Sequence, residues 1–196
     1  MLIPLIAATL LASTPSPLEV VKSGYANVQK VASAPGATVE KLATAVDTFV
    51  DFNELARRAL GETWNTLTPA QRKEFTGAMR GMLRAFYAQR ILGTGQTAIT
   101  YGEETLNGDE AIVRTTVTVE RTQLPIAYKL YRQSRKPRGW RIYDIVTGNT
   151  SLLEDYRVQF NELLVTQGFN GLLATVKARR AQVENLAPSR KAPAAK

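Results

Sequence analysis

The spacing of apolar residues changes twice along this chain, and this change constrains the fold more than any other feature. Between residues 17 and 92 apolar residues recur every three or four positions, as on one face of an α-helix. From residue 98 to 146 they alternate with polar residues, as in a strand with one buried face. Helical spacing returns from residue 151 to about residue 184. This order predicts an α+β fold rather than alternating parallel βαβ units.

Capping residues divide the helical regions into separate helices. Four positions carry Ser, Thr or Asp followed three residues later by Glu or Gln, a pattern that caps helix N-termini. These positions are Ser16, Asp51, Thr68 and Ser151. With Gly and Pro as breaks, we expect helices at about residues 17–31, 38–50, 51–61, 68–92, 151–167 and 169–184. On the helix at 68–92, Arg72, Lys73, Arg80 and Arg84 are expected to lie mainly off the apolar face.

Strand signals fill the middle of the chain. We expect strands at residues 98–101, 111–121, 124–133 and 140–146, with a hairpin at Asn107-Gly108 and a turn at 135–139. Val113, Val117 and Val119 share one face of the second strand. The predicted architecture is one curved antiparallel sheet of about four strands with helices packed on one face. Such a sheet leaves space for an apolar pocket beneath the helices.

The two ends of the chain differ from its centre. Residues 2–12 form an apolar run that would rise about 16 Å as a helix, roughly half of a membrane's hydrocarbon core. We therefore expect a signal peptide at 1–14, a folded domain at 16–185 and a disordered basic tail at 186–196. The net charge is +8, of which +5 lies in the last twenty residues. This distribution argues against nucleic acid as a partner.

The chain has no Cys and no His. This excludes Ser-His-Asp and Cys-His nucleophilic sites and every metal site built on His or Cys, and we expect no metal and no cofactor. The candidate chemical group is Asp144, which alternation places on the same strand face as Trp140 and Ile142. A carboxylate there is either a general acid or base in a pocket, or a structural partner of a backbone amide or of an arginine such as Arg157.

Three blocks of sequence resemble the MlaC family, also called toluene-tolerance or organic-solvent-resistance proteins. The resemblance extends over about residues 20–180. The blocks are Leu67–Phe75 continuing to Met82–Tyr87, Gly139–Val146 continuing to Thr147–Leu152, and Asp155–Phe160 followed by Gly168–Leu173.

The resemblance implies a periplasmic, monomeric carrier of phospholipid and not an enzyme. Such a carrier would move lipid between an outer-membrane lipoprotein complex and an inner-membrane ABC transporter with an MCE domain, and so support outer-membrane lipid asymmetry. The implied fold is an NTF2-like half with helical additions. Two alternatives stay open: another apolar cargo such as a hopanoid, and an NTF2-like pocket enzyme that uses Asp144.

The implied pocket holds acyl chains and leaves the head group at its mouth, which predicts weak head-group selectivity. An Arg or Lys near the mouth could meet the phosphate, but the sequence does not select one. The residues expected to line the pocket are Phe49, Phe52, Leu55, Met79, Met82, Leu83, Phe86, Val117, Val119, Tyr128, Leu130, Trp140, Ile142, Val146, Tyr156 and Phe160.

Overall fold

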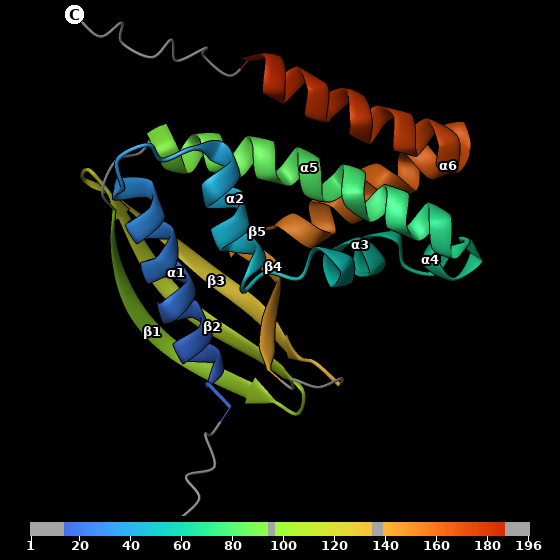
Figure 1. Cartoon of the computed structure of the whole chain (residues 1–196). Coiled ribbons are helices and arrows are strands. Elements are labelled where there is room, and N and C mark those ends of the chain that lie inside the picture. Colours follow the sequence, from blue (N-terminus) through green and yellow to red (C-terminus); the bar gives the residue numbers. More distant parts are fainter. Residues whose placement is uncertain (1–13, 94–96, 135–138, 187–196) are drawn as a thin grey trace, which may run out of the picture.

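A computed structural model describes residues 14–93, 97–134 and 139–186 (Figure 1). It is an α+β fold, as predicted, with one antiparallel sheet and helices against its concave face. The elements in chain order are α1 (Pro17–Ser33), α2 (Val39–Asp47), α3 (Phe52–Leu60), α4 (Thr63–Thr66), α5 (Pro69–Gly93), β1 (Ala98–Asn107), β2 (Glu110–Val119), β3 (Thr122–Arg132), β4 (Trp140–Thr147), β5 (Thr150–Ser151) and α6 (Leu152–Leu186).

The sheet is a meander in which each strand pairs with the next one along the chain, in the order β1-β2-β3-β4-β5. Two features differ from the sequence prediction. β1 continues to Asn107 instead of ending at Tyr101, across an irregularity in its pairing between Tyr101 and Glu104. A two-residue strand, β5, adds a fifth member by pairing with the end of β4. The short helix α4 was also not predicted.

The predicted caps form hydrogen bonds at the helix starts. Ser16 and Glu19 make a reciprocal capping box, and Thr68 and Gln71 do the same at α5. The Asp51 carboxylate accepts the N–H groups of Asn53 and Glu54 at the start of α3. Because these caps satisfy N–H groups that have no partner within the helix, they locate the helix starts from local sequence alone.

Helix α6 has two arms that meet at Gly168. This residue has φ 66° and ψ −175°, a backbone conformation that favours glycine over other residues. Figure 1 shows the two arms lying on different sides of α5. The turn allows both arms to contact α5, and so produces the two helices that the sequence predicts at 151–167 and 169–184.

The largest core cluster lies among α3, α5 and α6. The Phe75 and Phe160 rings pack edge to face with centroids 5.4 Å apart, and both side chains are fully buried. Met79 and Leu172 belong to the same cluster. A second cluster, which includes Val21, Val113 and Leu130, joins α1 to the sheet. The helices therefore attach to one another and, separately, to the sheet.

Some predictions fall outside this description. The signal peptide expected at 1–14, most of the turn at 135–139 and the tail at 186–196 lie largely or wholly outside the described residues. Within the described ranges, no helix has the length and apolar character needed to cross a membrane.

Replacing Phe160 with alanine tests the helical core. We expect Phe160→Ala to lower the free energy of unfolding by about 3–5 kcal/mol, because a fully buried aromatic side chain leaves a cavity. Val158→Ala on the same helix is the control, since Val158 is 69% exposed and should change stability by less than about 0.5 kcal/mol. Urea unfolding measures both, and equal effects would contradict this description of the core.

An apolar cavity between the sheet and the helices

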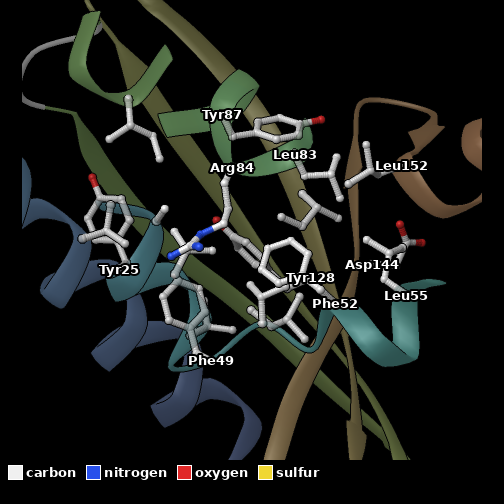
Figure 2. A pocket seen from close by; sticks show the side chains of 18 of the residues that line it. Tyr25, Phe49, Phe52, Leu55, Leu83, Arg84, Tyr87, Tyr128, Asp144 and Leu152 are labelled. Atoms are coloured by element: carbon white, nitrogen blue, oxygen red, sulfur yellow. The ribbon is translucent and has the colours of Figure 1, made fainter. Parts of the chain in front are cut away.

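A cavity of about 320 Å³ lies between the sheet and the helical layer (Figure 2). Its walls come from α1, α2, α3, α5, the first turn of α6, and strands β2, β3 and β4. Most of the lining side chains are aliphatic or aromatic. The volume lies at the lower end of the roughly 300–1,000 Å³ common for ligand sites. The described part of the chain has no group of three carboxylates that could hold a metal ion.

Eight of the sixteen residues predicted to line a pocket lie on the wall of this cavity. They come from the segment before α3, from α3 and α5, and from three strands. These residues are Phe49, Phe52, Leu55, Leu83, Val117, Val119, Tyr128 and Ile142.

The other eight predicted residues lie elsewhere. Met79, Met82, Phe160 and Tyr156 pack in the cluster of α3, α5 and α6. Leu130 and Trp140 pack in the cluster at the end of the sheet near α1. Phe86 is 39% exposed and stacks edge to face on Tyr87, which does line the cavity. Val146 lies on β4 away from the lining residues.

A bulge in β4 explains the position of Val146. Leu130 pairs with Ile142, but the preceding residue, Lys129, pairs with Asp144, so Tyr143 is an extra residue in β4. One extra residue reverses the faces on which the following side chains lie. Ile145 therefore lines the cavity opposite Tyr128, and Val146 does not. Strict alternation from Trp140 could not predict this reversal.

The segment before α3 forms the wall between the helices and β4. The Ile142 N–H donates to Phe49 C=O at 2.9 Å, and the Asp51 N–H donates to Ile142 C=O at 2.8 Å. The Arg141 guanidinium donates to the carbonyls of residues 47, 48 and 50 at 2.8, 2.5 and 2.9 Å. These bonds fix the Phe49 and Phe52 side chains toward the cavity. Sequence reasoning missed Arg141, because its partners are about ninety residues away.

Helix α1 closes the cavity by packing directly on this segment. A Cβ atom at Gly24 would lie 2.7 Å from the Phe49 ring, so only glycine permits the contact without a shift. Tyr25 on the same helix donates from its hydroxyl to Thr97 C=O at 2.6 Å, and Gln29 donates to the Thr97 hydroxyl at 3.0 Å. The polar groups of Tyr25, Gln29 and Thr97 at this end of the cavity are thus paired with one another.

Asp144 lies at the cavity wall, and its side chain is fully buried. Its carboxylate accepts the Ser151 hydroxyl at 2.7 Å and the Leu153 N–H at 3.0 Å, and it pairs with Lys129 at 3.0 Å. The ion-pair partner is therefore Lys129, whereas Arg157 pairs with Glu154. Because Leu153 is in the first turn of α6, Asp144 joins β4 to the start of this helix. These contacts favour a structural role over that of a general base.

Tyr128 is the polar side chain that β3 contributes to the wall. Burial raises the pKa of its phenol from the ordinary value of 10 to about 12. The phenol is therefore neutral near pH 7, and this part of the wall carries no charge.

The fold and the cavity define a small α+β domain with an apolar cavity between its sheet and its helices. A family model described as MlaC protein matches residues 19–178. The chain belongs to the MlaC family.

Two known proteins extend this comparison. The chain is 23% identical over 137 residues to the intermembrane phospholipid transport system binding protein MlaC of Haemophilus influenzae. The aligned region covers 68% of this chain and 64% of that relative. The chain thus spans somewhat less than two thirds of that relative's length. A solved structure of a phospholipid-binding protein from Ralstonia solanacearum, in complex with a phospholipid, superposes with a TM-score of 0.78 at 24% identity, over 87% of this chain and 99% of that chain. This likeness shows that the fold is shared.

The structural role of Asp144 can be tested by Asp144→Asn. We expect a loss of about 1–3 kcal/mol in the free energy of unfolding, because the change weakens a buried ion pair and a helix cap. Asp109→Asn removes an ion pair whose carboxylate is 83% exposed and should change stability much less. Chemical denaturation compares the two variants. Unchanged stability in Asp144→Asn would contradict this structural role.

The raised pKa of Tyr128 predicts a loss of stability in alkali. Between pH 10 and about 12 the unfolded chain releases this proton while the folded protein retains it, so stability falls as pH rises through this range. Below pH 10 the contribution is fully present. We expect Tyr128→Phe to lose less stability than the unsubstituted protein over the same interval, as measured by urea unfolding at several pH values. Equal losses would mean that Tyr128 titrates normally.

Proposed function

We propose that this protein binds phospholipid and carries it through the periplasm between an outer-membrane complex and an inner-membrane ABC transporter with an MCE domain. The observation that carries the proposal is the apolar cavity between sheet and helices in a member of the MlaC family. The names of the two similar proteins, one a phospholipid transport protein and one solved with a phospholipid, support the same cargo.

The energetics of the cargo explain why a carrier needs such a cavity. Burying one methylene group stabilises by about 0.8 kcal/mol, so exposing two acyl chains of about 28 methylenes would cost on the order of 20 kcal/mol. Acyl chains inside the cavity would avoid this cost, because they would contact apolar side chains such as Phe49, Leu83 and Val117 instead of water. No cofactor or nucleophile is needed for such a transfer.

The cavity must also widen to hold two chains, because about 320 Å³ is small for a diacyl lipid. Helix α1 is held by contacts that involve side chains: Val21 packs on the sheet, the Leu18 N–H donates to the Glu104 carboxylate and the Tyr25 hydroxyl donates to Thr97 C=O. By contrast, the segment before α3 is held by backbone hydrogen bonds to β4. We infer that acyl chains enter by separating α1 from the rest of the wall, which breaks these side-chain contacts.

Filling the cavity tests the proposal. Val119→Trp places a large side chain on the cavity face of β2, and we expect it to reduce the lipid that co-purifies from a bacterial periplasm by about tenfold or more while the fold persists. The adjacent Thr118 lies on the opposite face of the strand, so Thr118→Trp should retain the lipid. Native mass spectrometry measures the bound mass.

The bound mass also separates the outcomes. A mass matching one or two diacyl phospholipids in the unsubstituted protein and its absence in Val119→Trp support the proposal. A polycyclic triterpenoid without phosphate would support a different apolar cargo. No bound lipid, and no uptake from mixed lipid vesicles, would overturn the carrier function.

A further inference from the structure

Arg84 is a cation on the wall of an otherwise apolar cavity. It projects from α5, and Figure 2 shows its guanidinium among Tyr25, Phe49 and Tyr128. Its Nε atom is buried and has no hydrogen-bond partner within the described part of the chain. An unpaired buried donor costs free energy. The Nε atom itself has almost no accessible surface, whereas the Arg84 side chain as a whole is 28% exposed. The sequence pattern predicts that Arg84 lies mainly off the apolar face of its helix, whereas the structure places Arg84 on the cavity wall.

The charges around Arg84 do not balance. Its Nη2 atom lies 3.0 Å from the Asp47 carboxylate and 3.5 Å from the Thr44 hydroxyl. Asp47 also forms an ion pair with Arg80, so one carboxylate faces two guanidinium groups. The other charged residue on the cavity wall, Asp144, is paired with Lys129. The cluster of Asp47, Arg80 and Arg84 therefore carries a net charge of +1.

An apolar cavity with one unbalanced cation matches an amphiphile with one anionic group beside its acyl chains. A guanidinium is planar, always charged and suited to phosphate oxygens. Resting on the function proposed above, we propose that Arg84 forms a phosphate subsite in which its guanidinium donates an N–H to a phosphodiester oxygen of the bound lipid. Because every diacyl phospholipid carries this group, the subsite recognises the phosphate without selecting among head groups.

A pair of matched variants tests this subsite. Arg84→Gln removes the cation from the cavity and leaves Asp47 paired with Arg80. Arg57→Gln removes the same charge, but Arg57 is 51% exposed, pairs with Glu54 and does not line the cavity. The probes are vesicles that contain phosphatidylglycerol and diacylglycerol with identical acyl chains, which differ in the phosphate and its attached glycerol. Native mass spectrometry reports the ratio in which the two lipids are bound.

We expect Arg84→Gln to lower the ratio of bound phosphatidylglycerol to diacylglycerol by about tenfold, which corresponds to about 1.4 kcal/mol. Arg57→Gln should leave this ratio unchanged, and Arg84→Lys should restore part of it because the charge returns without the planar fork. The ratio of phosphatidylethanolamine to phosphatidylglycerol should stay the same in Arg84→Gln, since both lipids carry the phosphate. Circular dichroism confirms that each variant is folded.

Two results would overturn the subsite. One is an unchanged ratio in Arg84→Gln, and the other is an equal fall in both glutamine variants, which would assign the effect to net charge. If the unsubstituted protein takes up neither lipid, the carrier function fails and the subsite fails with it. If it takes up both lipids with no preference that depends on Arg84, the carrier function stands and only the subsite fails.

Discussion

The pairing between the segment before α3 and the edge of β4 determines where the cavity can exist. Two backbone hydrogen bonds to Ile142 and three from the Arg141 guanidinium hold this segment against the sheet. The second attachment is at Asp144, which joins β4 to the start of α6. Both of these attachments are on β4, whereas α1 packs on β2 and β3 through the second core cluster. The cavity occupies the space enclosed between these attachments.

Local sequence predicts the elements of this fold well, because their causes are local. Caps at Ser16 and Thr68 act within four residues, and alternation along β2 reports which of its faces is buried. The same reasoning is less successful for the candidate site, because only half of the predicted pocket residues line the cavity. Val117 and Ile142 line the cavity as expected, whereas Met82 and Phe160, equally apolar, pack between helices. Periodicity identifies a buried face but does not indicate whether that face meets a cavity or another helix.

The residues that sequence reasoning missed have long-range causes. The bulge at Tyr143 depends on how β4 pairs with β3. Because of this bulge, Ile145 lines the cavity and Val146 does not. Arg84 lies on the same helix as Arg72 and Arg80, which line a separate polar groove, and the packing of α5 against the rest of the fold places Arg84 on the cavity wall. Sequence periodicity does not distinguish a polar helical residue at a cavity wall from one on the protein surface. Their role follows from what the tertiary fold places opposite them.

A carrier must bind its cargo tightly enough to keep it from water and weakly enough to release it. Apolar burial meets the first need, but it does not orient the ligand, because dispersion and hydrophobic contacts are nearly independent of direction. A single directional group at one end of the cavity supplies orientation at small cost in release, since one charged hydrogen bond contributes only about 1.5–3 kcal/mol against the much larger burial of the chains. Because Asp47 already shares its charge between Arg80 and Arg84, a departing phosphate would leave the arginine beside a carboxylate instead of alone. On this argument, the shared aspartate stabilises the unloaded state and so favours release.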